Sequence, residues 1–144
     1  MPRTTSAELL ERIIVAGVAI TTRALSEARP ALDLTFPQWR AMLVVGEQPE
    51  GARVSEVASR VGVTLPATSR LLRRLAARGL VETTADEHDR RATRARLTPA
   101  GNHARDAILA YRRERIAETV RVATLSPPTR TELTRLADAL DQHR

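Results

Sequence analysis

The sequence predicts a mainly helical fold with one small β-hairpin, which places the chain in the α+β class. Helix start and stop signals divide its 144 residues into about six helices. Before the fifth of these helices, two short segments alternate apolar and polar side chains around a polar tip, as the strands of a hairpin do. A chain of this length has room for one domain with added elements and can bury a core of its own.

Composition and charge narrow the possible functions. There is no cysteine, which removes disulfides, thiolate catalysis and thiol-based redox sensing. No apolar run approaches the roughly 18 residues of a membrane span, and the N-terminus does not resemble a signal peptide, so we expect a soluble, cytoplasmic protein without membrane contact. The formal net charge is +6, and residues 53–101 hold ten arginines against five acids. This clustering indicates a polyanionic partner.

Long helices are predicted at both ends of the chain. The first covers residues 5–28, is apolar over more than one face, and ends before Pro30. Thr-Pro and Ser-Pro pairs supply the cap and first-turn residues of two further helices, at residues 98–124 and 126–144.

The second predicted helix, residues 36–46, begins with a capping box. The Thr35 hydroxyl and the Gln38 side chain are spaced to satisfy the free amides of its first turn, and Leu34 with Trp39 fits the hydrophobic staple that often accompanies such a box.

Two shorter helices follow the loop at residues 48–53. We expect Ser55 to cap the first of them, which stops at Gly62. Thr64 caps the next, with Pro66 in its first turn, where a missing amide hydrogen costs nothing. Two helices joined by three residues form a helix-turn-helix.

A hairpin then follows Gly79, a good helix terminator. Residues 80–83 and 93–97 alternate like two strands around the charged tip at residues 85–91. A hairpin in this place is a wing, so the expected architecture is a winged helix-turn-helix lobe with helical regions on either side.

The helix after Thr64 has two different faces at about 100° per residue. It contains arginines but no acid, and an arginine fork binds phosphate or the O6 and N7 edge of guanine in the major groove of DNA. A solvated basic face is the alternative, which the neighbouring turn and hairpin disfavour. The residues expected to face inward are Leu65, Thr68, Leu71, Leu72 and Leu75. Those expected to face outward are Pro66, Ser69, Arg70, Arg73 and Ala77, with Ala67 and Arg74 at the side.

The tip contains the triplet Asp89-Arg90-Arg91. An acid two residues before an arginine can hold the guanidinium in a fixed direction, which suits insertion into a narrow, electronegative minor groove. The alternative is a charged hairpin tip that remains in water.

The run from Val54 onward resembles the DNA-binding lobe of the MarR family of bacterial transcription regulators. The family's wing signature, Asp-x-x-Asp-Arg-Arg followed by a strand ending Leu-Thr-x-x-Gly, is matched by Asp86, Asp89, Arg90, Arg91, Leu97, Thr98 and Gly101. The resemblance implies a recognition helix at residues 64–74, a minor-groove contact from Arg91 supported by Asp89, and phosphate contacts from Arg94 and Arg96. The implied DNA-binding residues are Thr64, Pro66, Ala67, Ser69, Arg70, Arg73, Arg74, Asp89, Arg90, Arg91, Arg94 and Arg96.

One strand departs from the family pattern. Arg94 and Ala95 stand where larger apolar residues are common, so the wing packs more loosely or carries extra positive charge.

The resemblance also implies an intertwined homodimer. Residues 1–34 and 99–144 would be the dimerisation helices, and residues 35–98 the winged lobe. The apolar surface of residues 13–20, together with Leu133, Leu136, Ala137 and Leu140, supports this independently, although intramolecular packing is the alternative. Two recognition helices would then contact a pseudopalindromic operator in double-stranded DNA, with half-sites about 34 Å apart.

Members of this family are typically repressors that small, often aromatic or phenolic, ligands release from DNA. A small aromatic or anionic effector is therefore expected here. Arg40 could pair with such an anion, with Glu47 or with a backbone carbonyl. Ordinary packing is the alternative reading of every candidate, and the candidates are Val18, Thr22, Trp39, Arg40, Leu43 and Tyr111.

Two other classes of function compete with a regulator. An enzyme is disfavoured because His88, His103 and His143 are scattered and no phosphate loop or nucleophile motif occurs, and we expect no metal or cofactor. The other is a sequence-nonspecific DNA-coating or architectural protein. Aromatic residues make up only 2%, which disfavours stacking on single strands and favours duplex DNA.

Overall fold

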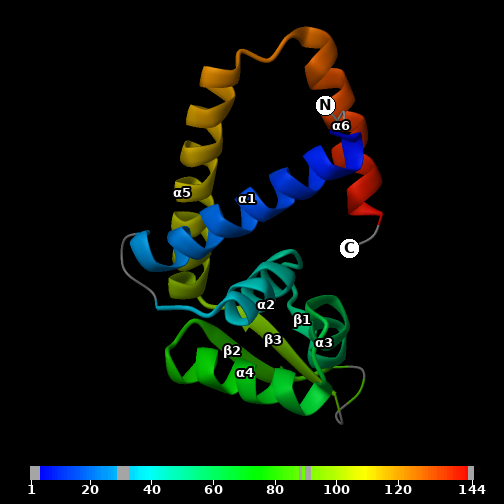
Figure 1. The fold of residues 1–144 in the computed structure, drawn as a ribbon. Coiled ribbons are helices and arrows are strands. Elements are labelled where there is room, and N and C mark those ends of the chain that lie inside the picture. The colour runs from blue at the N-terminus through cyan, green and yellow to red at the C-terminus, as the bar shows by residue number, and fades with distance from the viewer. Residues whose placement is uncertain (1–3, 29–32, 88, 90–91, 143–144) are drawn as a thin grey trace. The chain divides into compact units, whose positions relative to one another are not determined.

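The computed structural model describes residues 4–28, 33–87, 89 and 92–142. The chain divides into two compact units, Met1–Arg112 and Arg113–Arg144, and the boundary falls within the fifth helix. The elements, labelled in Figure 1, are α1 (Ser6–Glu27), α2 (Phe36–Gly46), β1 (Ala52–Arg53), α3 (Val54–Val61), α4 (Leu65–Ala77), β2 (Val81–Ala85), β3 (Thr93–Leu97), α5 (Pro99–Ala123) and α6 (Pro127–Asp141). This mainly helical architecture with a small antiparallel sheet confirms the predicted fold class.

The start of α2 confirms the predicted capping box. The Thr35 hydroxyl accepts a hydrogen bond from the Gln38 backbone amide, and the Gln38 side chain accepts one from the Thr35 amide. The predicted staple residues, Leu34 and Trp39, are both buried in the same core.

The start of α3 differs from the prediction. The helix begins at Val54 with Arg53 as its cap residue and no side-chain cap hydrogen bond, so Ser55 lies in the first turn and does not cap it. The reason is that Ala52 and Arg53, expected to end a loop, form the short strand β1, and α3 follows that strand directly.

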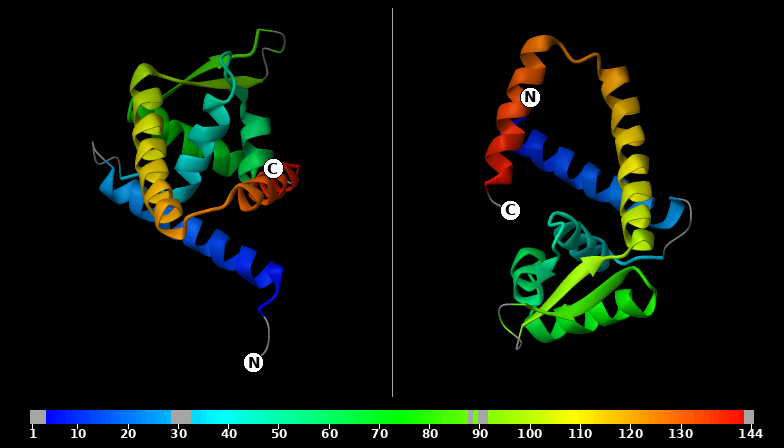
Figure 2. Two further views of the ribbon diagram at one scale, coloured as in Figure 1. Left: turned by 90° about the horizontal axis from the view of Figure 1, so that it is seen from above. Right: turned by 180° about the vertical axis from the view of Figure 1, so that it is seen from behind.

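The sheet has the strand order β1-β3-β2, and both pairings are antiparallel. The central strand β3 has the predicted bounds, whereas β2 begins one residue later and ends two residues later than expected. Figure 2 shows the hairpin of β2 and β3 beside α4. On the inner face of the sheet, Ala52 pairs with Ala95 and Val81 with Leu97, and all four are buried.

The core of the first unit lies between the helices and this inner face. Its largest fully buried apolar side chains are Trp39, Met42, Leu72, Leu75 and Ile108. Because Ile108 is on α5 and Leu72 on α4, the core joins the start of α5 to the helix-turn-helix.

Several large apolar side chains lie outside this core. On α1, Ile13 is 59% exposed and Val15 is 63% exposed. In the second unit, Leu133, Leu136 and Leu140 of α6 are all exposed. None of the helices in the described part of the chain combines the length and apolar character needed to cross a bilayer.

The start of α5 packs closely on the end of α4. The Thr98 hydroxyl donates to the Gly79 carbonyl at 2.6 Å and accepts from the Gly101 amide at 3.0 Å. A Cβ atom at Gly101 would lie 1.9 Å from the Leu80 carbonyl oxygen. Only glycine fits at this contact, which accounts for the glycine that ends the Leu-Thr-x-x-Gly pattern.

We predict that Gly101→Ala lowers the free energy of unfolding by about 3 kcal/mol, because the backbone must shift to admit the methyl group. Gly62→Ala is the matched control, since Gly62 has φ +77° but open space around it. Its loss should be about 1 kcal/mol, from backbone strain alone. Urea denaturation at one protein concentration measures both. Equal losses in the two variants would contradict the close contact.

Candidate nucleic-acid interface

The inner face of α4 is fixed in the core. Leu72 and Leu75 are buried, and Thr68 is 0% exposed with its hydroxyl donating to the Thr64 carbonyl at 3.0 Å. Leu71 is half-buried. Leu65, also predicted to face inward, is 52% exposed, so that prediction was wrong. Periodicity gives the direction of a side chain but not whether a neighbouring element reaches far enough to cover the end of a helix.

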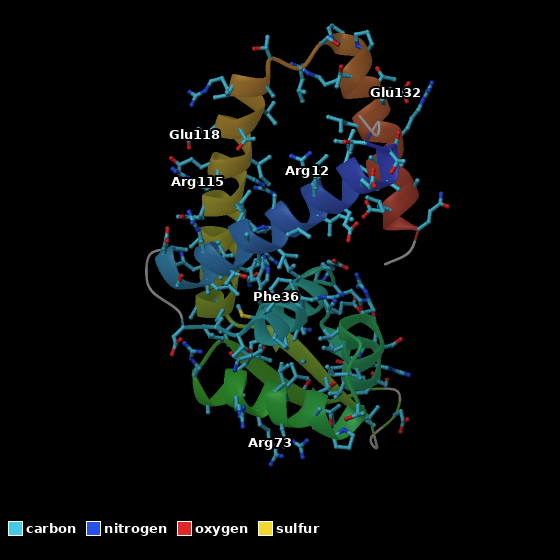
Figure 3. The ribbon with its side chains drawn as sticks, viewed as in Figure 1. Arg12, Phe36, Arg73, Arg115, Glu118 and Glu132 are labelled. Atoms are coloured by element: carbon cyan, nitrogen blue, oxygen red, sulfur yellow. The ribbon has the colours of Figure 1, made fainter. Side chains whose placement is uncertain are left out.

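The outer face of α4 is basic. Arg70, Arg73 and Arg74 are exposed, and none of them has a hydrogen-bond or ion-pair partner among the described residues. Figure 3 shows Arg73 pointing away from the body of the lobe. Arg70 and Arg74 also border a hollow of about 280 Å³ that Thr35 and Pro37 line from the start of α2. This face therefore presents unpaired guanidinium groups to solvent.

The other predicted contacts on α4 are small side chains. Thr64 caps the helix by accepting the Ala67 amide, and Pro66 is exposed in the first turn. Ala67 and Ser69 are half-buried, and the Ser69 hydroxyl donates to the Leu65 carbonyl at 3.0 Å. Small side chains beside the arginines leave room for close approach to a flat ligand such as a base edge.

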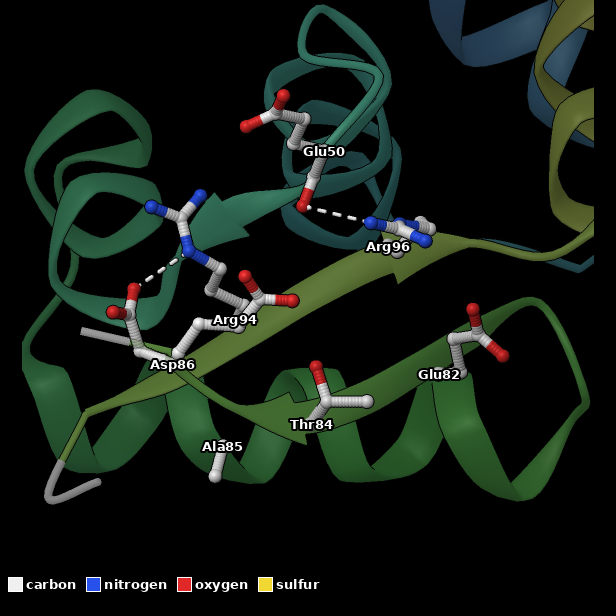
Figure 4. Close-up of a pocket in the computed structure, with 8 residues that line it drawn as sticks. Glu50, Glu82, Thr84, Ala85, Asp86, Arg94 and Arg96 are labelled. Atoms are coloured by element: carbon white, nitrogen blue, oxygen red, sulfur yellow. Dashed lines mark hydrogen bonds and ion pairs between the residues drawn. The ribbon is translucent and has the colours of Figure 1, made fainter. Parts of the chain in front are cut away.

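The base of the wing is organised around Asp86, whose side chain is 1% exposed. Its carboxylate accepts two hydrogen bonds from Arg53, at 3.0 and 3.3 Å, and one from Arg94 at 2.6 Å. Figure 4 shows the bond from Arg94. Arg94 also donates to the Gly51 carbonyl at 2.9 Å. Two positive side chains thus enclose one buried negative charge.

Arg96 lies on the same outer face of the sheet. It is exposed, donates to the Glu50 carbonyl at 3.3 Å and stands opposite Glu82 in the strand register (Figure 4). Both arginines of β3 therefore donate to backbone carbonyl oxygens of the turn at residues 50–51. The sequence predicted extra positive charge in this strand, and both arginines that carry it have hydrogen-bond partners within the lobe. Phosphate contacts from Arg94 and Arg96 stay a prediction.

The wing tip lies partly outside the described residues. Arg91, the predicted minor-groove residue, belongs to that part, as do Arg90 and His88. Asp89 is exposed, and its backbone amide donates to Asp86 Oδ1 at 3.1 Å. The predicted support of Arg91 by Asp89 stays a prediction.

Solved structures of transcription regulators share this fold. A mutant of MepR from a multidrug-resistant clinical isolate of S. aureus matches with a TM-score of 0.77 and 21% identity, over 99% of this chain and 100% of that chain. CouR from Rhodococcus jostii, bound to p-coumaroyl-CoA, matches with a TM-score of 0.71 and 26% identity, over 93% and 87%. BpsR from Bordetella bronchiseptica, whose DNA binding is regulated by 6-hydroxynicotinic acid, matches with a TM-score of 0.67 and 21% identity, over 94% and 97%. A search of the curated proteins finds no match.

The family model of the MarR family matches residues 32–92, which span the lobe from α2 into the wing. The chain therefore resembles the MarR family over its winged lobe. Its fold is that of MarR-family transcription regulators, which implies a DNA-binding regulator, and such regulators are generally not enzymes.

The predicted effector residues lie in different surroundings. Trp39 is 1% exposed in the core, and Leu43 and Tyr111 pack against that core while partly buried. Val18 and Thr22 lie on the exposed surface of α1. Three of these side chains are therefore in or against the core, and two are on an exposed face.

Two of the polar candidates have partners within the first unit. Arg40 donates to the Arg60 carbonyl at 2.8 Å, which is the backbone alternative among the partners predicted for it. Glu47, the other intramolecular alternative, pairs instead with the Arg60 side chain, and that hydrogen bond raises the pKa of Arg60. The Tyr111 hydroxyl donates to the Glu27 carboxylate.

Arg112 has a buried hydrogen-bond donor without an acceptor among the described residues. This donor is Nε, and desolvation lowers the pKa of the Arg112 guanidinium. Elsewhere, no group of three or more histidine or acidic side chains in the described residues could hold a metal ion.

Sequence reasoning did not include Arg53 or Asp86 among the site residues. Asp86 stood in the wing signature, which was the available signal, but its partners lie 33 residues before it and 8 residues after it in the chain. Only the folded sheet brings these side chains together.

We predict that Asp86→Asn lowers the free energy of unfolding by about 3 kcal/mol, because two guanidinium groups lose their common counter-charge while partly buried. The control is Glu132→Gln, which breaks the exposed pair with Arg135 and should change stability by less than about 1 kcal/mol. Urea denaturation gives both values. An Asp86→Asn variant as stable as the control would show that the cluster does not stabilise the lobe.

Proposed function

We propose that this protein is a homodimeric, sequence-specific transcription regulator that represses by binding a pseudopalindromic operator and is released by a small effector. The observation that carries the proposal is the outer face of α4, where three arginines have no partner among the described residues of a MarR-family lobe. Guanidinium groups in that state attract phosphate and the O6 and N7 edge of guanine. Because its target is chromosomal DNA, the proposal includes a cytoplasmic location.

The proposed grip on DNA has two parts. The face of α4 enters the major groove, with Arg70, Arg73 and Arg74 among the small side chains that allow close approach. The wing reaches the adjacent minor groove through Arg91, which Asp89 supports and Arg90 accompanies.

The proposed dimer uses the helices outside the lobe, residues 1–34 and 99–144. Its support is the exposed apolar surface of α1 and, within the second unit, the exposed leucines of α6. Apolar surface of this extent is typical of a protein interface. The orphaned Arg112 Nε adds support, since a second chain could supply an acceptor.

The proposed effector is a small aromatic or anionic molecule bound near Val18, Thr22, Trp39, Arg40, Leu43 and Tyr111. The support is chemical. The DNA binding of BpsR is regulated by 6-hydroxynicotinic acid, an aromatic acid, and CouR was solved with p-coumaroyl-CoA. Only one N–H group of the Arg40 guanidinium donates to the Arg60 carbonyl, so its other N–H groups can still pair with an anion.

A protein that coats DNA without sequence preference is the second candidate, because the same basic face of α4 would serve it. The two candidates respond differently to competitor DNA. A regulator bound to its operator resists a large excess of random duplex, whereas a coating protein exchanges freely at equal salt.

We predict that Arg91→Ala and Arg73→Ala each weaken operator binding by about 1 to 3 kcal/mol, with the dimer unchanged. Wild-type affinity should also fall steeply with salt, because counterions leave the phosphates. Fluorescence anisotropy on labelled duplex measures both. Salt-insensitive binding would contradict the proposal, and loss of dimerisation in Arg91→Ala would mean that the wing is misplaced.

We predict that Ile13→Glu converts the dimer to a monomer at micromolar concentration, because an unpaired carboxylate would be buried at the interface. The control Ser59→Glu adds the same negative charge at an exposed position of α3 and should leave the dimer intact. Sedimentation equilibrium distinguishes the two states. A monomeric wild-type protein, or an Ile13→Glu variant that dimerises as tightly, would refute the proposed interface.

A further inference from the structure

The buried carboxylate of Asp86 connects residues of three different strands or strand ends. Asp86 directly follows β2, Arg53 joins β1 to α3, and Arg94 is the second residue of β3. In the register of the sheet, Arg53 is opposite Arg94, and Arg94 is opposite Thr84. Asp86, at the end of β2, therefore binds β3 through Arg94 and both β1 and the start of α3 through Arg53.

The same residue holds the described ends of the wing tip. The Asp86 amide donates to the Ala92 carbonyl at 2.9 Å, and its carboxylate accepts from the Asp89 amide. The Ala92 amide donates to the Asp89 carbonyl at 2.8 Å. Asp89 and Ala92 are therefore hydrogen-bonded to each other, and each is also hydrogen-bonded to Asp86.

The bonds to the two arginines are directional. Arg53 binds through two nitrogens, and the Nε of Arg94 approaches to 2.6 Å. Charge-assisted bonds of this kind fix angles as well as distances. Apolar packing of the same volume can match a buried ion cluster in stability, but it lacks the directional hydrogen bonds of the guanidinium groups.

We infer that Asp86 is the positioning residue of the wing: through Arg53 and Arg94 it fixes the direction of the hairpin relative to α3 and α4, so that wing and recognition helix engage adjacent grooves of one DNA segment. This inference rests on the proposed function. Asp86 itself touches no DNA, since its side chain is 1% exposed.

The test separates positioning from stability with the variant Arg53→Met/Asp86→Leu/Arg94→Met in the full chain. Replacing a buried ion cluster with apolar side chains of similar volume is often neutral for stability. The probe is a duplex of about 30 base pairs that wild-type protein selects from a random library, long enough for two half-sites one turn apart. Dimethyl sulfate reports both grooves, because it methylates guanine N7 in the major groove and adenine N3 in the minor groove.

We expect the folded triple variant to keep guanine N7 protection, lose adenine N3 protection and bind about tenfold more weakly. A second variant, Arg94→Met alone, serves if the triple variant unfolds. It leaves the ion pair between Arg53 and Asp86 in place, so it should keep the fold and weaken adenine N3 protection. The control Arg135→Gln removes the same net charge on α6 and should keep both protections.

Two results would overturn the inference alone: adenine N3 protection retained in both folded variants, or loss of both protections together. A wild-type protein that selects no duplex would overturn the proposed function, and the inference with it.

Discussion

The candidate nucleic-acid interface depends on one constraint. The inner face of α4 is held in the core so strongly that the side chains of its outer face need no partners within the lobe. Leu72 and Leu75 are buried with the α2 residues Trp39 and Met42, and Thr68 satisfies its hydroxyl on the helix itself. With burial on one side supplying the stability, the arginines on the other side have no structural role within the described lobe. A basic face that folding does not require is available for a polyanion, and its rigid backbone reduces the entropy lost on binding.

The wing depends on a second, electrostatic constraint. A carboxylate as deeply buried as that of Asp86 is costly unless charged donors surround it. Here Arg53 and Arg94 supply those donors from two strands, so stability and wing direction have one origin. Arg94 stands where the family resemblance led us to expect a larger apolar residue. The structure gives the departure a physical reason, since the residue serves as a counter-ion.

The sequence predicted what short-range rules decide. The Thr35 capping box, the bounds of β3 and the buried Leu72 face follow from spacing within a few residues. The rest depends on contacts distant in the chain. Strand β1 has two residues and exists only because it pairs with β3, which moved the start of α3 away from Ser55. The exposure of Leu65 and the arginine partners of Asp86 likewise depend on which elements meet in the fold.

The central claim is that the two faces of α4 and the wing serve sequence-specific recognition of duplex DNA. The most direct test is to select fragments of the native genome with the full-length protein and then to footprint them. A regulator of this kind predicts a small set of enriched fragments, each protected over two half-sites about one helical turn apart. Uniform recovery of fragments at moderate salt, without a shared protected sequence, would contradict the account.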